Sequence, residues 1–189
     1  MHITWNTITT KLTEIAPQII KELNPGITDV QLENLERKIG KKLPESFIAF
    51  YRVHNGQHPD SAGLIDGEEL LSFERILKEW GIWKELLDGK TFEDDRGPYT
   101  SEPDEEIKED WWNAAWIPIT YDGCGNHYCL DLDPSEGGNY GQIIRMWHDG
   151  PERTLEAESF EAWIKNYANR LENDELMYSE DYFGIVEKD

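Results

Sequence analysis

The clearest pattern of apolar and polar positions along the chain lies in residues 116–147. Apolar side chains alternate with others in 116–121 and 128–132, and Ile143, Ile144, Met146 and Trp147 lie in a third stretch. The segments between them are rich in Gly, Pro, Asn and Asp, the residues that form turns and end strands. An alternating pattern bounded in this way predicts an antiparallel meander of three strands with one buried face.

Elsewhere the apolar residues recur every three or four positions, which is typical of amphipathic helices. Residues 5–23 carry such a stripe, but Pro17 interrupts it and predicts a kink or two short helices. Thr28 and Gln31 have the spacing of a capping box for a second helix, which Gly40 closes.

Three more helices are expected further along the chain. Pro44 suits the first turn of one of them, with His54 on its inner face and Asn55-Gly56 at its end. Ser72 and Ser159 stand where N-caps are expected, each directly before a new apolar stripe.

Length and composition fit a single domain over residues 1–189. Only 38% of the residues are hydrophobic, but the chain holds eight Trp, eight Tyr and six Phe. Each aromatic side chain removes roughly 150–250 Å² from water when it is buried. The aromatic content therefore favours a folded chain over a disordered one.

The net charge narrows the range of partners. The chain has 39 acidic and 18 basic residues, for a net charge of −21. A field of this sign repels nucleic acid and anionic membranes and attracts basic proteins. Two segments carry most of the excess: residues 93–110 have a net charge of −7 and residues 172–189 a net charge of −6. Because Pro98 and Pro103 discourage regular structure, residues 93–110 are expected to form a long, mobile acidic loop, and residues 172–189 an acidic tail.

No stretch approaches the roughly 20 apolar residues of a membrane span, and no apolar run follows Met1. The chain is therefore expected in the cytoplasm. Cys124 and Cys129 do not make a disulfide framework, and a cytoplasmic pair is expected to be reduced.

Candidate metal ligands have a simpler explanation. Asp122, Asp131 and Asp133 are expected to converge at strand ends near Glu136, where a hard cation could bind. The spacing from Asp131 resembles the start of an EF-hand loop, but Glu136 stands where that loop needs glycine. The favoured interpretation is that these carboxylates shape turns by accepting hydrogen bonds from local backbone amides.

Cys124, His127, Cys129 and His148 suggest zinc, but the cysteines lack the C-x-x-C spacing. A small packed thiol is favoured for Cys129. His54 and His148 could each act as a base, but no Ser or Cys accompanies them in a recognisable catalytic arrangement. Phosphate-binding loops and metalloprotease motifs are also absent from the sequence. No cofactor, metal or catalytic residue is predicted.

Three stretches resemble a known family: ITDVQLENLERKIGKKLPESFIAFYRVHNGQ, WIPITYDGCGNHYCLDLDPSEGGNYGQIIRMWHD and EAESFEAWIKNYANRL. They are similar, in the same order, to the SUKH superfamily of fungal cell-wall-assembly regulators and bacterial immunity proteins. The resemblance implies an α+β fold: an antiparallel sheet with helices packed against it, several of them N-terminal and one C-terminal. It also implies a protein that binds and does not catalyse, and bacterial members of this kind neutralise polymorphic toxins.

The leading hypothesis is an immunity protein whose acidic surface blocks a basic toxin domain, such as a nuclease, encoded by a neighbouring gene. The candidate contacts are acidic residues of the loop, two tryptophans after it as aromatic anchors, and carboxylates at the sheet end. They are Glu102, Asp104, Glu105, Glu106, Glu109, Asp110, Trp111, Trp112, Asp122, Asp131 and Asp133. The alternative is that one or both tryptophans pack under the loop against the meander, and this is the favoured interpretation for at least one of them. The alternatives are a scaffold or regulator with a non-toxin partner, and a hydrolase that uses Asp131 or Asp133.

Overall fold

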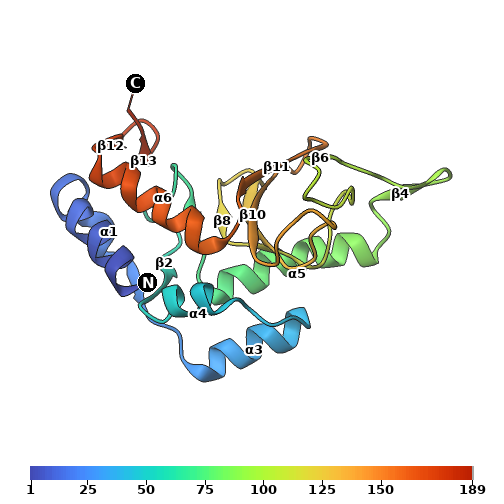
Figure 1. Cartoon of the computed structure of the whole chain (residues 1–189), viewed down its shortest axis with the longest axis horizontal. Coiled ribbons are helices and arrows are strands. Elements are labelled where there is room, and N and C mark those ends of the chain that lie inside the picture. The colour runs from blue at the N-terminus through green and yellow to red at the C-terminus, as the bar shows by residue number, and fades with distance from the viewer. Residues whose placement is uncertain (189) are drawn as a thin grey trace.

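Six helices and thirteen strands make up residues 1–188, the part of the chain that the computed structural model describes (Figure 1). The helices are α1 (His2–Ile15), α2 (Pro17–Lys21), α3 (Asp29–Ile39), α4 (Glu45–Tyr51), α5 (Phe73–Asp88) and α6 (Phe160–Glu172). The strands of the central sheet are β6 (Glu102–Pro103), β7 (Trp116–Pro118), β9 (His127–Asp131), β10 (Gln142–Met146) and β11 (Glu152–Ala157). The remaining strands form two-stranded pairs: β1 (Leu23–Pro25) with β2 (His54–Gln57), β3 (Glu69–Leu70) with β8 (Thr120–Tyr121), β4 (Glu93–Asp94) with β5 (Gly97–Pro98), and β12 (Leu176–Ser179) with β13 (Gly184–Glu187).

The central sheet has the strand order β6-β11-β10-β9-β7. β7, β9, β10 and β11 pair antiparallel, and β6 adds a parallel edge strand. The predicted meander and the α+β class are confirmed. One predicted strand is divided, however, because the chain leaves the central sheet after Pro118, and β8 pairs with β3 instead.

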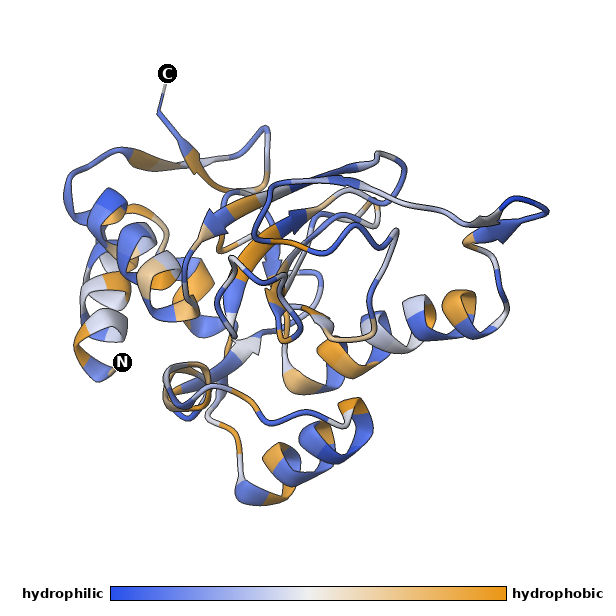
Figure 2. Cartoon of the chain, turned by 45° about the vertical axis from the view of Figure 1, so that its right-hand side comes forward, coloured by the Kyte–Doolittle hydropathy of each residue, from blue (hydrophilic) through white to orange (hydrophobic). Residues whose placement is uncertain are grey.

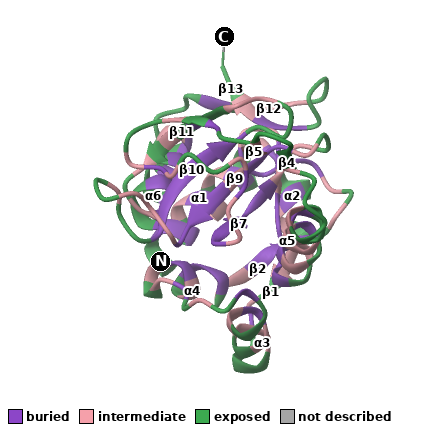
Figure 3. Cartoon of the chain, turned by 90° about the vertical axis from the view of Figure 1, so that its right-hand side faces the viewer, coloured by how far each residue is buried: buried purple, intermediate pink, exposed green. Residues whose placement is uncertain are grey.

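The expectation of one buried face is wrong, because both faces of the sheet are covered (Figure 3). Ile117, Leu130 and Ile143 belong to the main hydrophobic core on one face. Cys129 and Ile144, which alternate with them along the strands, belong to a second apolar cluster on the other face. The C-terminal half of α5 and the chain between β6 and β7 supply Trp83, Ile107 and Trp112 to that cluster. Strand residues that point to either face of the sheet are therefore apolar.

The main core joins the N-terminal and C-terminal helices to the sheet. Trp5 of α1 stacks on Phe50 of α4 with ring centroids 4.4 Å apart, and Phe160 of α6 meets Phe50 edge-on at 5.2 Å. The Trp5 indole also donates to the Phe50 carbonyl at 2.9 Å. Figure 2 shows the amphipathic character of the helices, with hydrophobic and hydrophilic positions alternating around α5.

The predicted helix ends are confirmed at several positions. Pro17 divides the first stripe into α1 and α2. Thr28 and Gln31 form the capping box of α3, and Gly40 ends that helix in the left-handed region at φ 70°. The hydroxyl groups of Ser72 and Ser159 accept hydrogen bonds from the first turns of α5 and α6.

The predicted end of the third helix is wrong. α4 ends at Tyr51, and His54, Asn55 and Gly56 lie in β2. The side chain of Asn55 contacts a residue that is distant in sequence: its Oδ1 accepts a hydrogen bond from the Phe73 N–H at 2.8 Å. The Asn-Gly pair therefore helps to position the start of α5 and does not cap α4.

The two acidic segments are more regular than expected. Residues 93–98 form the β4–β5 hairpin, and β6 pairs with β11, so the prediction of a long irregular loop over 93–110 is corrected. The acidic tail folds back as the β12–β13 hairpin. These strands are short. Their pairing depends on tight turns or on partners that are distant in sequence, and for this reason no local apolar pattern predicted them.

Candidate protein-binding surface

An exposed group of carboxylates lies in β6, the edge strand of the central sheet, and in the chain directly after it. Five of the predicted contacts are exposed there, and they are called here the acidic face: Glu102, Asp104, Glu105, Glu109 and Asp110. An open hollow of about 520 Å³ lies among most of these residues, with Ile107 and Lys108 in its lining. The fold thus concentrates negative charge on one open surface.

Backbone pairing with β11 fixes the start of the acidic face. The Glu102 N–H donates to the Pro151 carbonyl at 2.7 Å, and the Asp104 N–H donates to the Arg153 carbonyl at 2.9 Å. The Asp104 carboxylate in turn accepts from the Leu155 N–H at 2.7 Å. Asp104 is consequently both an exposed charge and a support for the strand beside it.

A second set of contacts holds the acidic face against the β9–β10 connection. The Glu106 carbonyl accepts from the Gln142 side-chain amide at 2.9 Å and from the Ser135 N–H at 3.1 Å. The Ser135 hydroxyl donates to the Glu105 carbonyl. A surface held in this way loses little conformational freedom when a partner docks.

Asp133, one of the three carboxylates of the predicted second patch, lies beside the acidic face. Its carboxylate is 2.7 Å from the Lys108 ammonium and accepts from the Asn113 amide at 3.2 Å. The hydrogen bond from Lys108 lowers the pKa of Asp133, so the group stays ionised. Because Lys108 neutralises it, Asp133 adds little free charge to the surface.

Asp131 and Asp122 do not belong to this surface. Asp131 is fully buried and accepts from the Gln142 amide at 2.9 Å and the Asp133 N–H at 2.9 Å, and burial raises its pKa to about 6. Asp122 accepts from the N–H groups of Cys124 and Asn126 in the β8–β9 turn. Both carboxylates shape turns, as the favoured interpretation predicted.

The expected convergence of the three aspartates is wrong for Asp122. It precedes β9, whereas Asp131 ends that five-residue strand, so the two lie at opposite ends of it. At about 3.4 Å per residue the strand separates its two ends by roughly 14 Å. Successive turns of an antiparallel meander alternate between the two ends of the sheet, which is why the three aspartates do not meet.

The two tryptophans after the acidic face differ in exposure. Trp112 is only 2% exposed and stacks on Trp83 with ring centroids 6.1 Å apart, so it is a core residue and not an anchor. Trp111 is half-buried and lies edge-on to Tyr99 at 6.2 Å. Trp111 remains the candidate aromatic contact at this surface.

A buried arginine holds Trp111 in place. The Arg153 guanidinium lies 5.4 Å from the Trp111 ring and donates to the Trp111 carbonyl at 2.7 Å. It also donates to the carbonyls of Gly150 and Glu152, and burial lowers its pKa to about 10. No sequence pattern marked Arg153, because a charged residue is not expected at an inward position of a strand.

The histidines and cysteines have structural surroundings. His127 is fully buried, with Nδ1 against the Thr120 carbonyl at 2.7 Å and Nε2 3.2 Å from the Trp83 indole N–H. Burial lowers the His127 pKa to about 4. His54 and His148 contact the Asn24 carbonyl and the Asn126 amide oxygen, respectively. Within residues 1–188, no group of three or more His, Cys, Asp or Glu side chains is placed to hold a metal ion.

The two cysteines should react differently with a thiol reagent. Cys124 is exposed, whereas Cys129 is fully buried and burial raises the pKa of its thiol. Because the thiolate is the reactive form, we expect rapid labelling of one thiol in the native protein and of two after unfolding. Mass spectrometry of the labelled protein measures this difference, and Cys124→Ser should abolish the rapid reaction. Rapid native labelling of Cys129 would contradict the packing of β9.

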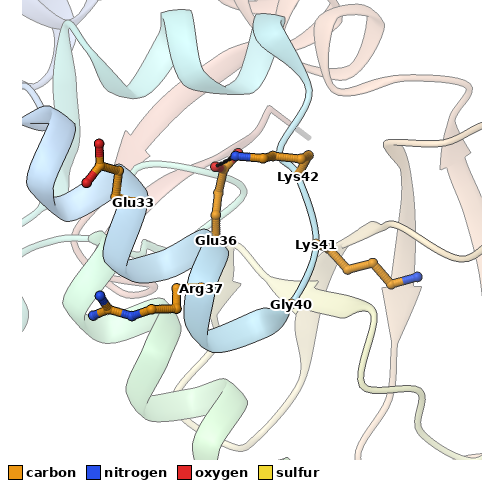
Figure 4. Close-up of a pocket in the computed structure, with 6 residues that line it drawn as sticks. All are labelled: Glu33, Glu36, Arg37, Gly40, Lys41 and Lys42. Carbon is orange, nitrogen blue, oxygen red and sulfur yellow. Dashed lines mark hydrogen bonds and ion pairs between the residues drawn. The ribbon is translucent and has the colours of Figure 1, made fainter.

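A second hollow at the end of α3 offers a mixed set of charges (Figure 4). Its lining includes Glu33, Glu36, Arg37, Lys41 and Lys42. The Lys42 ammonium lies 2.6 Å from the Glu36 carboxylate, while the Lys41 side chain points away from the helix. These charges offset one another, so this hollow lacks the single sign that distinguishes the acidic face.

The fold and this surface together describe an α+β domain with both sheet faces packed and one acidic edge exposed. The sequence model of the SMI1 / KNR4 family (SUKH-1) matches residues 26–166. The chain therefore belongs to the SMI1/KNR4 family, and the resemblance stated from the sequence is confirmed.

Individual relatives extend the comparison. The chain is 23% identical to the cell wall assembly regulator SMI1 of Saccharomyces cerevisiae, over 90% of this chain and 40% of the relative. It is 24% identical to the glucan synthesis regulatory protein of Neurospora crassa, over 94% of this chain and 39% of the relative. It is 31% identical to F-box only protein 3 of Bos taurus, over 88% of this chain and 34% of the relative. The chain thus spans roughly a third to two-fifths of the length of these relatives.

None of the helices described in residues 1–188 has the length and apolar character to cross a membrane.

Proposed function

We propose that this chain is a regulatory binding module that docks another protein against its acidic face and catalyses no reaction. The exposure of five carboxylates on a framework fixed by β11 and the β9–β10 connection carries this proposal. A basic partner surface is the complement of such a face, and charge of this kind accelerates encounter and fixes orientation. Two fungal relatives are named as regulators, which supports the regulatory part.

The hydrolase alternative loses its candidate residues under this proposal. Asp131 is enclosed by Gln142 and the Asp133 backbone, and Asp133 is paired with Lys108. These contacts favour a supporting role over activation of water or attack on a substrate. Both act as supports for the surface that binds.

Neutralising part of the acidic face is expected to slow partner binding at least about tenfold at low salt. The variant is Glu102→Gln, Glu105→Gln and Glu109→Gln combined. The chain would be used to capture its partner from the source cells, and association of the purified pair would then be measured at several salt concentrations. The rate for the unmodified chain should fall as salt rises, because exposed charges are screened over about 10 Å at 0.1 M.

The matched control removes three exposed carboxylates from α1, α3 and α6, which lie away from the acidic face (Figure 1): Glu14→Gln, Glu33→Gln and Glu172→Gln. It changes the net charge equally, so its association rate should stay within about threefold of that of the unmodified chain. Equal loss in both variants would assign the effect to net charge alone. A partner retained equally by all three proteins, or turnover of a substrate by the purified chain, would overturn the proposal.

A second function, immunity against a basic toxin domain, is favoured by the net charge of −21. It uses the same binding face but a different partner, encoded by a neighbouring gene. Co-expression with the C-terminal domain of that neighbour distinguishes the two functions. Cell rescue together with co-purification supports immunity. A cell-wall glucan defect that appears on loss of the chain and disappears on its return supports regulation.

A further inference from the structure

A third open hollow lies beside the turn of the C-terminal hairpin, and its lining residues are distant in sequence from the acidic face. Its volume is about 340 Å³, and its lining includes Ile19, Glu22, His58, Asp60, Ala62 and Phe183. This volume lies near the lower end of the range of roughly 300–1,000 Å³ that is usual for ligand sites. Figure 1 shows the hairpin, formed by β12 and β13, next to α6 near the C-terminal end.

Phe183 stands out on two independent grounds. It is 55% exposed, although it is a large apolar residue. Its φ is also 47°, in the left-handed region that a bulky side chain rarely adopts. A residue that is strained and half exposed is poorly explained by stability of the fold, and strained residues tend to gather at functional sites.

The backbone around Phe183 is held firmly. Its carbonyl accepts from the Gly63 N–H at 2.9 Å, and the Gly63 carbonyl accepts from the Ile185 N–H at 2.9 Å. On the other side of the hollow, the His58 N–H donates to the Glu22 carbonyl at 2.7 Å. The walls therefore keep their places before any partner arrives, which lowers the entropic cost of binding.

Charge around the hollow specifies what could fill it. Glu22 and Asp60 line it, and Glu180 and Asp181 belong to the same turn as Phe183. All four residues are exposed, and no Lys or Arg is among the described lining residues. Ile19 and Ala62 supply a buried apolar side. The complement is an apolar side chain with positive charge on either side of it.

We propose that this hollow docks a segment of a partner protein that inserts one apolar side chain beside Phe183 and places flanking Lys or Arg residues against the surrounding carboxylates. This inference rests on the proposed binding function, and it adds a contact site separate from the acidic face. A hot spot of this kind, an aromatic wall with a charged rim, contributes most of its affinity through the buried anchor.

Selection from a phage library of random 12-residue peptides tests the proposal. The full chain serves as bait at about 150 mM salt, with Phe183→Gly as the counter-selection bait. The enriched peptides should share an apolar residue flanked by Lys or Arg. Synthetic copies should bind Phe183→Gly at least tenfold more weakly than the unmodified chain, and the Glu22→Gln, Asp60→Asn double variant a few-fold more weakly.

Three controls decide what a result means. Met177→Ala removes an exposed apolar side chain from the same hairpin, outside the hollow, and should leave peptide affinity unchanged. The unfolding temperature of Phe183→Gly should stay within about 3 °C of that of the unmodified chain, since relieved strain offsets lost packing. The acidic-face variant should bind the peptides normally.

Several outcomes would overturn the inference. They are enrichment of no peptide that depends on Phe183, equal binding to Phe183→Gly, and a fall of more than about 10 °C in the unfolding temperature of that variant. Peptides that depend on the acidic face and not on Phe183 would also overturn it, while leaving the proposed function intact.

Discussion

Gly56→Ala is expected to lower the free energy of unfolding by about 2–5 kcal/mol. Alanine must adopt a left-handed backbone conformation at this position, and its Cβ atom must also overlap neighbouring backbone atoms, and the two costs add. Gly56 has a φ of 62°. A Cβ atom at this position would lie 2.5 Å from the Leu71 carbonyl carbon and oxygen and 2.6 Å from the Leu70 oxygen. All three atoms belong to the backbone, so no side chain can rotate away.

The neighbours of Gly56 prevent relief by a backbone shift. Asn55 is bonded to the Phe73 N–H, and the Gln57 side chain accepts from the N–H groups of Leu64 and Leu70. Moving β2 away from Leu71 would break buried hydrogen bonds. Each broken bond would leave a buried polar group without a partner, which costs about 1–3 kcal/mol. The strain must therefore stay in the folded state.

Gly81→Ala is the matched control for this measurement. Gly81 lies inside α5, and a Cβ there meets nothing within 4 Å. Alanine should raise the free energy of unfolding by about 0.5–1 kcal/mol, because glycine costs backbone entropy in a helix. Urea unfolding of both variants measures the difference. A Gly56→Ala protein within 1 kcal/mol of the unmodified chain would show that β2 and Leu71 are not in close contact.

Gly56 also shows where sequence reasoning reaches its limit. The sequence pattern identified Asn55-Gly56 as a pair that ends a helix. The structure does constrain both residues, Asn55 by a hydrogen bond and Gly56 by its backbone conformation. It assigned the constraint to the end of α4, because only local signals are visible in a sequence. The actual cause is the approach of β2 to the segment before α5, which is a contact between residues distant in the chain.

The sheet gives a similar lesson. The sequence pattern predicted β9 and β10 closely, because each is a short apolar segment bounded by residues that form turns. β11 was missed, since its fully buried inward residue is Arg153 and not an apolar one. Burial of both sheet faces could not be predicted either, because the second cover comes from a segment that is acidic overall.

The candidate site was predicted in part. Composition was enough to expect exposed carboxylates near residues 102–110, because clustered charges are rarely buried. It could not separate Trp111 from Trp112 or Asp131 from Asp133. Each of these pairs consists of one covered and one accessible residue, and the difference depends on how the segment packs against the second face of the sheet.

Arg145→Met is expected to destabilise the fold by roughly 3–5 kcal/mol, the cost of leaving one member of a buried ion pair alone. The Arg145 guanidinium lies 2.6 Å from the Glu68 carboxylate, and both side chains are less than a tenth exposed. Glu68 also accepts from the Thr120 hydroxyl at 2.6 Å. Methionine keeps most of the aliphatic stem but removes the charge, and with it the guanidinium contacts to the Tyr128 and Trp147 rings at 4.6 and 4.3 Å.

The cost should depend on pH in a defined direction. Burial already raises the pKa of Glu68 in the folded state, and Arg145 opposes that shift. Without Arg145 the pKa of Glu68 rises further, so the folded variant favours the protonated form. A carboxyl group with a raised pKa in the folded state contributes stability that is present at low pH and is lost as the pH rises through the folded pKa. The difference in free energy of unfolding between the two proteins should therefore grow from about pH 5 to pH 8.

A second substitution separates the lost charge pair from lost packing. Glu68→Gln combined with Arg145→Met removes the uncompensated carboxylate, so the double variant should be more stable than Arg145→Met alone at about pH 8. Its stability difference from the unmodified chain should also lose most of its pH dependence. If the double variant were as unstable as the sum of its single variants at every pH, Glu68 and Arg145 would act independently and the buried pair would not stabilise the junction of β3, β8 and β10.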